Sequence, residues 1–246
     1  MRLTRNVSLL AVILLAAVGA LARSDEAKEE VKEKALDAPH NVKVKVRMEG
    51  LYTADVPLQV VCYFKYTPEG AKKMTGAPVE LDKRLGGVIG SLRERGEFVG
   101  DQLETLLITP PEDSIKAKAL LLVGLGDEDA LSLKLMEAVG RVSLREATRH
   151  GVRRVGFAPL IRDQGNSKFG TGDVATAVVR GMLSAYDTDR RLRKEGLAKP
   201  FALDEWWVEA GPAYFDETVT GVQKASAEAT DLIKARESKP YASGKR

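Results

Sequence analysis

Strand-like and helix-like patterns of apolar residues alternate along the chain between about residue 41 and residue 237. At the start of this region three valines alternate with basic residues, which is typical of a half-buried strand at the edge of a sheet. Denser apolar runs further along predict buried strands. The predicted strands are 42–46, 56–64, 105–109, 117–123, 152–158 and a segment around Trp206, Trp207 and Val208.

Apolar residues at helical spacing predict four helices between and after these strands. The first has Leu81, Leu85, Val88, Ile89 and Leu92 on one face and ends near Gly96; the second follows an N-cap at Ser132; the third follows Gly172; the last carries Val222 to Ile233. Strands that alternate with helices of this length predict an α/β fold with a largely parallel sheet flanked by helices.

The first 22 residues have the three-part pattern of a secretory signal peptide. Arg2 and Arg5 precede an apolar run at 7–21, and the small residues Ala20 and Ala22 suit a signal peptidase. The run is short for a membrane span. We therefore expect cleavage after Ala22, a secreted or periplasmic location and no membrane association afterwards; an uncleaved N-terminal anchor is the alternative.

Charged residues of both signs dominate 23–40, which predicts a solvated spacer that forms coil or a transient helix. Pro39 closes this spacer, and His40 at its edge is expected to be exposed rather than catalytic. The folded domain is expected at 41–237, followed by a polar tail at 238–246.

Composition excludes several classes of protein. The 246 residues include 38 Lys and Arg against 35 Asp and Glu, a net charge of +3 that does not favour a nucleic-acid partner. Removal of the signal peptide, with its two arginines, lowers the net charge to +1. One cysteine and two histidines cannot form a disulfide framework, a cysteine-based zinc site or a histidine-rich metal centre. Cys62 is expected to be buried, and no metal or cofactor is expected.

Few motifs in the sequence point to a catalytic site. Gly124-Leu-Gly126 follows a predicted strand, but the third glycine of a dinucleotide fingerprint is replaced by Asp129. A strand-to-helix turn explains this segment better. His150 closes the second predicted helix, where a cation suits the helix dipole. We predict no catalytic residue.

One glycine-rich loop could form an anion-binding cradle at the start of the third helix, because backbone N–H groups there would face a ligand. The candidate residues are Gly165, Ser167, Lys168, Gly170, Thr171 and Gly172. The alternative is a connector in which Thr171 or Asp173 caps the helix.

An ordered set of short motifs resembles the N-terminal domain of the leucyl aminopeptidase (cytosol aminopeptidase) family. The motifs are Leu81-Asp-Lys-Arg-Leu-Gly-Gly87, Arg95-Gly-Glu-Phe-Val-Gly100, Glu104-Thr-Leu-Leu107, Leu122-Val-Gly-Leu-Gly126 and Gly181-Met-Leu-Ser-Ala-Tyr186. Together they cover roughly residues 42–237. The resemblance implies a macrodomain-like, three-layer fold with a mixed, largely parallel sheet.

The resemblance also bears on activity. In that family a larger second domain holds two metal ions through a lysine and several carboxylates, and its N-T-D-A-E-G-R signature is not found in this sequence. A two-metal site needs all of its ligands to activate water. The chain is therefore expected to be a non-catalytic, stand-alone N-terminal domain.

Three functions remain open at this stage. The first is a binding or assembly module, whose partner would be a second copy of the chain. The second is a macrodomain-like binder of a small anionic or nucleotide-type ligand at the glycine-rich loop. The third is an accessory subunit that joins a separate aminopeptidase-type catalytic subunit.

Overall fold

The computed structural model describes residues 31–237, and residues 31–237 belong to one compact unit. The expected signal peptide, its cleavage site, residues 23–30 of the expected spacer and the polar tail lie outside the described residues. The strands are β1 (Glu33–Asp37), β2 (Lys43–Arg47), β3 (Leu58–Tyr63), β4 (Thr105–Ile108), β5 (Leu120–Gly124), β6 (Arg154–Ala158) and β7 (Glu205–Glu209).

These strands form a seven-stranded sheet in the order β1-β2-β7-β6-β3-β5-β4. The central strands, from β2 to β5 in that order, run parallel, whereas β1 and β4 pair antiparallel at the two edges. The expectation of a mixed, largely parallel sheet is confirmed.

The helices are α1 (Pro68–Lys73), α2 (Ala77–Arg84), α3 (Val88–Glu94), α4 (Leu133–Arg149), α5 (Thr171–Lys194) and α6 (Phe215–Glu237). Short 3₁₀ turns lie at η1 (Pro39–Asn41), η2 (Glu128–Ala130), η3 (Arg162–Gln164) and η4 (Pro212–Tyr214). Ser132 caps α4 as expected, since its hydroxyl accepts a hydrogen bond from the Leu135 N–H at 3.1 Å.

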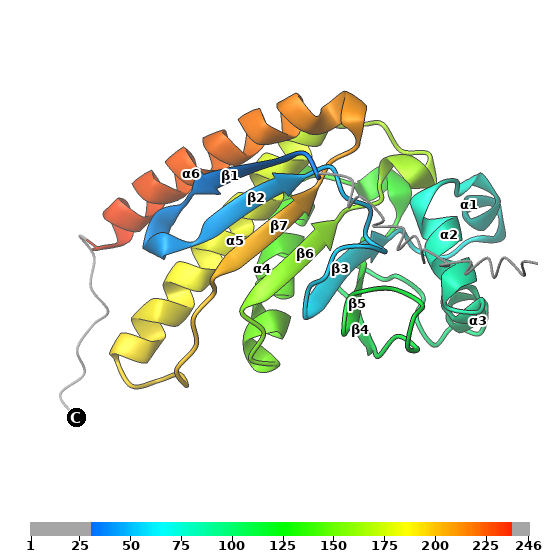
Figure 1. Cartoon of the computed structure of the whole chain (residues 1–246), viewed down its shortest axis with the longest axis horizontal. Helices are drawn as coiled ribbons and strands as arrows, with labels where there is room; N and C mark the ends of the chain where they lie inside the picture. The colour runs from blue at the N-terminus through cyan, green and yellow to red at the C-terminus, as the bar shows by residue number, and fades with distance from the viewer. Residues whose placement is uncertain (1–30, 238–246) are drawn as a thin grey trace, which may run out of the picture. The chain divides into compact units, whose positions relative to one another are not determined.

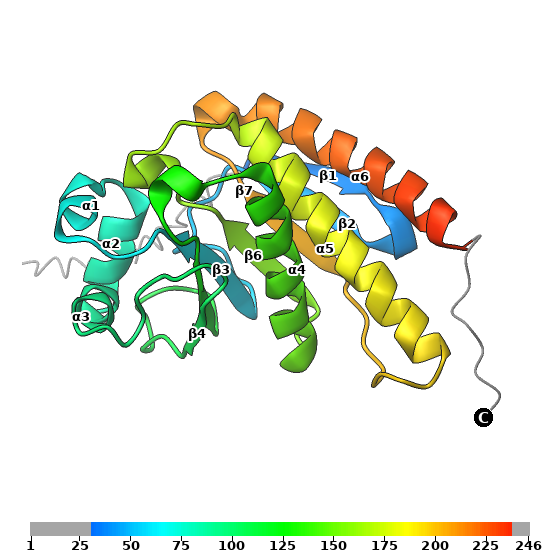
Figure 2. The ribbon, with the colours of Figure 1, turned by 180° about the vertical axis from the view of Figure 1, so that it is seen from behind.

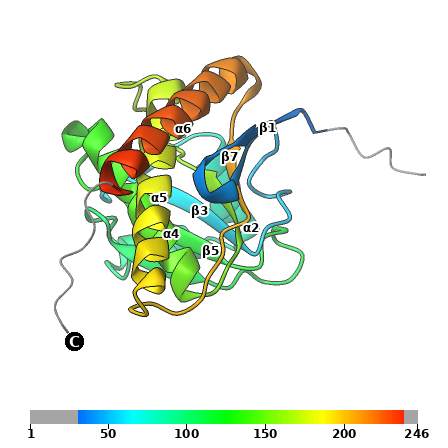
Figure 3. The ribbon, with the colours of Figure 1, turned by 90° about the vertical axis from the view of Figure 1, so that its left-hand side faces the viewer.

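Helices cover both faces of the sheet, so the three-layer expectation is confirmed. The long helices α4, α5 and α6 lie across one face, as Figure 2 shows from behind and Figure 3 from the side. Helices α2 and α3 pack on the other face at the end formed by β3 and β5 (Figure 1). Each interface has its own apolar core, and β3 and β5 contribute apolar residues to both cores; Cys62 in β3 is fully buried, as expected.

The first predicted helix is in fact two helices. Gly86 and Gly87 adopt left-handed backbone angles, with φ of 70° and 81°, and separate α2 from α3. The Asp82 carboxylate accepts hydrogen bonds from the Ile89 and Gly90 N–H groups, which satisfies donors in the first turn of α3. Val88 is consequently 38% exposed rather than part of the buried face.

The expected spacer is wrong from residue 33 onward. Residues 33–37 form β1, which pairs antiparallel with β2 along its whole length. The strand at 43–47 is therefore internal to the sheet rather than at its edge. The sequence pattern concealed β1 because four of its five residues are exposed and the fifth is only partly buried.

His40 is also less exposed than expected, because it packs against α5. Its Nε2 lies 3.0 Å from Asp187 Oδ1, and the same carboxylate accepts a hydrogen bond from Arg236 Nη1 at 2.9 Å. Asp187 is only 3% exposed. One buried carboxylate thus joins the turn after β1, the middle of α5 and the end of α6.

Glycines allow α5 to pack very closely on its neighbours. A Cβ at Gly140 of α4 would lie 2.0 Å from the Val178 carbonyl oxygen, and one at Gly181 of α5 would lie 2.0 Å from the Glu137 carbonyl oxygen. Both distances are far below van der Waals contact, so the two backbones touch at a point where no side chain fits.

A second contact of this kind joins α5 to α6. A Cβ at Gly221 of α6 would lie 2.2 Å from the carbonyl oxygen of Gly172, in the first turn of α5. Nearby, the Thr176 hydroxyl donates to the Gly172 carbonyl at 2.8 Å and lies 3.0 Å from that of Gly221. The start of α5 is thereby held against α6.

We expect Gly181→Ala to lower the free energy of unfolding by about 1–3 kcal/mol, because the new methyl group must displace the α4 backbone. Helix propensity alone predicts the opposite sign, a gain of about 1 kcal/mol. Urea unfolding measures the difference. Gly50→Ala is the control, since its Cβ would only approach Tyr52 Cδ2 at 3.5 Å. A Gly181→Ala variant as stable as the wild type would contradict the close packing.

Candidate functional site

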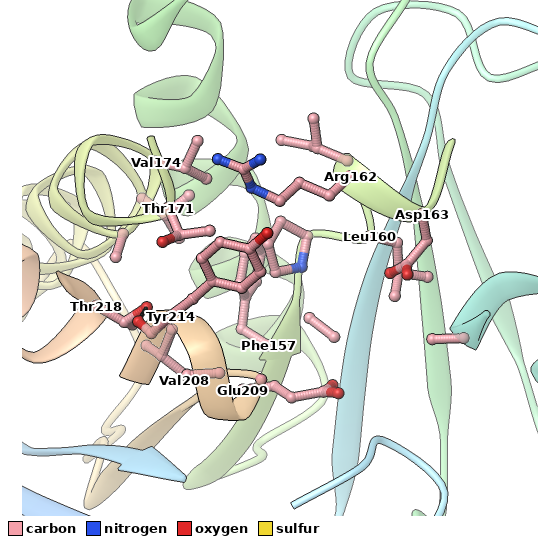
Figure 4. Close-up of a pocket in the computed structure, with 18 of the residues that line it drawn as sticks. Phe157, Leu160, Arg162, Asp163, Thr171, Val174, Val208, Glu209, Tyr214 and Thr218 are labelled. Carbon is pink, nitrogen blue, oxygen red and sulfur yellow. Dashed lines mark hydrogen bonds between the residues drawn. The ribbon is translucent and has the colours of Figure 1, made fainter. Parts of the chain in front are cut away.

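A cavity of about 270 Å³ opens where β6 and β7 end. Because these neighbouring strands are parallel, the segments that follow them, residues 159–164 and 210–214, emerge at the same edge of the sheet. The first turn of α5 and the start of α6 complete the walls (Figure 4). We call this space the β6/β7 cavity.

The floor of the β6/β7 cavity is apolar. It is formed by Phe157, Val174, Val178, Val208 and Ala210, all of which are buried. Phe157 stacks on Trp206, with ring centroids 5.9 Å apart and an interplanar angle of 26°, and this stacking holds the Phe157 ring in place at the floor of the cavity.

The segment after β6 takes a strained path around the cavity. Leu160 has a φ of 53°, a left-handed conformation that is unfavourable for a leucine. Gln164 holds this path: its amide donates to the Cys62 and Leu160 carbonyls, both at 3.0 Å, and accepts from the Phe64 N–H.

Gln164 also explains why the cavity lies between β6 and β7. The connections after β3 and β6 run in opposite directions, and open α/β sheets bind ligands at such a switch point. Here the buried Gln164 side chain fills the crevice between these two strands. The cavity therefore lies one strand away from the switch point, at the ends of β6 and β7.

The mouth of the cavity carries an arginine and a tyrosine. The Arg162 guanidinium lies 4.7 Å from the centroid of the Tyr214 ring, and both side chains are exposed. The Arg162 guanidinium forms no ion pair with any carboxylate in the part of the chain that the structure describes, and it donates one hydrogen bond there, to the Phe169 carbonyl at 3.5 Å.

Two carboxyl groups line the opposite side of the cavity, as Figure 4 shows for Glu209 and Asp163. Burial, reinforced by repulsion from Asp163 and Glu49, raises the pKa of Glu209 to about 8. Burial also raises the pKa of Asp163. The Oε2 atom of Glu209 is fully buried and has no hydrogen-bond partner among the described residues.

The glycine-rich loop is organised by a carboxylate from α6. Glu217 accepts hydrogen bonds from the Gly172 N–H at 3.0 Å and from the Thr171 hydroxyl at 2.8 Å. These bonds lower the pKa of Glu217. A carboxylate of the chain itself therefore sits where the sequence predicted an external anion, and neither Thr171 nor Asp173 caps α5 with its own side chain.

The other predicted loop residues mostly point elsewhere. Lys168 Nζ donates to the carbonyls of Leu131 and Asp129, at 2.9 and 3.2 Å, which ties the loop to the segment before α4. Gly165 forms a left-handed turn and Ser167 is exposed. Of the six candidates, only Thr171 lines the β6/β7 cavity. Anion binding by this loop stays a prediction.

Sequence analysis missed the carboxyl groups and the Arg162–Tyr214 pair. A usable pattern existed in β7, where alternation places Glu209 on the same face as Glu205 and Trp207, at the strand's carboxyl end.

Within residues 31–237 no group of three or more His, Cys, Asp or Glu residues is arranged to hold a metal ion. In the same range, every helix is too short or too polar to cross a membrane.

The layers, the strand order and the cavity at the carboxyl ends of the strands define a macrodomain-like α/β domain. The sequence model of the cytosol aminopeptidase family, N-terminal domain, matches residues 60–196. The chain belongs to the cytosol aminopeptidase family, of which the matching part is the N-terminal domain.

Individual relatives agree. The chain is 28% identical over 134 residues to a probable cytosol aminopeptidase of Thermosynechococcus vestitus, covering 54% of this chain and 26% of the relative. It is 29% identical over 161 residues to a probable cytosol aminopeptidase of Roseiflexus castenholzii, covering 63% and 31%. The chain thus spans about a quarter to a third of the length of these relatives.

Solved structures show the same fold at low sequence identity. A mutant of tomato leucine aminopeptidase superposes with a TM-score of 0.62 at 18% identity, covering 85% of this chain and 40% of the other. An Oceanobacillus iheyensis macrodomain with ADP superposes with a TM-score of 0.53 at 8% identity, covering 83% and 98%.

We expect Glu217→Ala to lower the free energy of unfolding by about 1 kcal/mol at neutral pH, because two N-terminal donors of α5 lose their acceptor. Since the folded state lowers the pKa of Glu217, this stabilisation is present above the ordinary carboxyl pKa and is lost as the pH falls through the folded-state value. Asp216→Ala, in the same first turn of α6, is the matched control. Equal losses in the two variants would contradict the capping role.

The raised pKa of Glu209 predicts the opposite pH dependence. Between about pH 5 and its folded pKa of about 8, the folded state binds the proton more tightly, so the free energy of unfolding falls as pH rises. Glu209→Gln should remove this fall and exceed the wild type at pH 8.5 by roughly 2–4 kcal/mol. Chemical unfolding at several pH values measures it, with Glu205→Gln as control. A Glu209→Gln curve parallel to the wild-type curve would contradict the assignment.

Proposed function

We propose that the chain is an exported, non-catalytic aminopeptidase N-terminal domain that acts as a binding module, and that the β6/β7 cavity receives a small molecule. The apolar start of the sequence supports export, and the family match to the N-terminal domain supports a non-catalytic role. The cavity is the observation that carries the binding role.

The properties of the cavity suit a small ligand. Sites for small molecules are concave and mostly apolar, with a few polar groups that fix the ligand's orientation. The β6/β7 cavity has an apolar floor, two carboxyl groups at one side and Arg162 with Tyr214 at its mouth. Carboxyl groups with raised pKa values in a cleft are more frequent at functional sites than elsewhere.

A nucleotide-type ligand is the second candidate. The fold is shared with a macrodomain whose structure contains ADP, and Arg162 could contact a phosphate at the mouth. The engagement of Lys168 and Thr171 within the chain, and the carboxyl groups inside the cavity, favour a different ligand class.

Assembly with a second chain is the third candidate. The face of β1, β2 and β7 turned away from α4–α6 carries Trp207, which has the Arg47 guanidinium 3.8 Å from one of its ring centroids. Arg47 and Lys45 on this face are paired with Glu33, Glu49 and Glu205, and a surface of such mixed charge would suit a second copy of the chain or a separate catalytic subunit.

Native mass spectrometry of the protein purified from its own host tests these proposals together. We expect the wild type to carry a small-molecule adduct. The Val174→Phe variant should lack this adduct, because the phenyl ring would fill the cavity. Thermal unfolding of the variant checks that it folds. A bare wild-type monomer would contradict the binding role, and a mass equal to a second polypeptide would favour assembly.

A further inference from the structure

Glu209 is a half-buried acid with no ion-pair partner among the described residues. Its Oε2 atom is inaccessible to solvent and unpartnered, and its side chain lines the β6/β7 cavity. Buried carboxyl groups are normally hydrogen-bonded or paired, because an isolated one is strongly unfavourable. The partner that the described part of the chain fails to supply could therefore come from a ligand.

The groups around Glu209 increase its need for a positive charge. Asp163 of η3 and Glu49, just after β2, both repel its ionised form. Tyr52 also faces it, and burial together with the charge of Glu209 raises the pKa of Tyr52 to about 12. Each of these neighbours is an acid.

The arginine opposite Glu209 in the sheet is paired with other carboxylates. Arg47 is opposite Glu209 in the β2–β7 register, but its guanidinium pairs with Glu49 at 2.9 Å and with Glu33 at 3.2 Å. The same guanidinium lies over the Trp207 ring. Arg162 belongs to the mouth of the cavity, where it stacks on Tyr214.

The rest of the cavity defines the other part of a ligand. Phe157, Val208 and Pro159 also line the cavity and offer an apolar surface for a ring or a short aliphatic chain. A ligand with a cationic nitrogen at one end and an apolar body would complement both regions.

We propose that the β6/β7 cavity binds a small organic cation, with an amidinium, guanidinium or ammonium group between Glu209 and Asp163 and an apolar body on Phe157 and Val208. This inference rests on the proposed binding function and names its ligand class. The proposed ligand is positively charged, whereas the glycine-rich loop predicts an anionic ligand.

Binding of such a cation is coupled to proton release. Near neutral pH the Glu209 carboxyl is largely protonated, because its pKa is about 8. A bound cation favours the ionised form and expels the proton to solvent. Affinity should therefore rise as pH increases from 6 to 8.5, where the carboxyl is increasingly ionised before the ligand arrives.

Benzamidine and benzamide test the proposal, since they share shape and differ in charge. Isothermal titration of the full-length wild type at pH 8.5 should show benzamidine binding at least about tenfold tighter than benzamide, a difference of about 1.4 kcal/mol. Titrations at pH 7 in two buffers of different ionisation enthalpy should reveal proton release. Glu209→Gln should lose about tenfold in benzamidine affinity and all of the proton release, whereas Glu205→Gln should match the wild type.

The outcomes separate this inference from the proposed function. Equal binding of benzamide and benzamidine, or unchanged benzamidine affinity in Glu209→Gln, would overturn the cation assignment. If a native adduct is nevertheless lost in Val174→Phe, the cavity still binds a small molecule of another class. Absence of both probe binding and a native adduct would overturn the proposed function together with the inference.

Discussion

Direct backbone contact between helices is the constraint on which the rest of this domain depends. Gly140 and Gly181 bring α4 and α5 together, and Gly221 brings α6 against the first turn of α5. Because no side chain separates these backbones, α5 has little freedom to slide or tilt. The starts of α5 and α6 are consequently fixed beside the ends of β6 and β7, and the β6/β7 cavity is the space that this arrangement leaves.

The residues that shape the cavity differ from those that form the sheet and the helix layer. The parallel strands and the helix layer are regular elements, whereas the segment after β6 follows a strained path through Leu160. Gln164 secures that path with three hydrogen bonds and closes the neighbouring crevice. The unfavourable conformation of Leu160 and the unpartnered Oε2 atom of Glu209 both border the β6/β7 cavity, and strained backbone is in general concentrated at functional sites of proteins.

Periodicity in the sequence was sufficient for the elements that bury one apolar face, such as α4 with its Ser132 cap, and the motif series gave the family and the layers. Periodicity did not predict β1, whose residues are largely exposed. It also did not predict the break at Gly86 and Gly87, where backbone conformation rather than hydrophobicity divides a helix. Of the candidate loop, only Thr171 lines the cavity, and the partners of Lys168 and Thr171 come from residues 37 to 46 positions away. Long-range pairing of that kind leaves no local pattern.

The buried carboxylate of Asp187 has a consequence for how the domain opens. It joins the turn after β1, through His40, to the end of α6, through Arg236, so the first and last described elements share one anchor in α5. Withdrawal of either partner leaves a desolvated charge that weakens the attachment of the other. We therefore expect local unfolding at the two ends of the domain to be coupled, so that amide hydrogens in β1 and in the last turns of α6 exchange together.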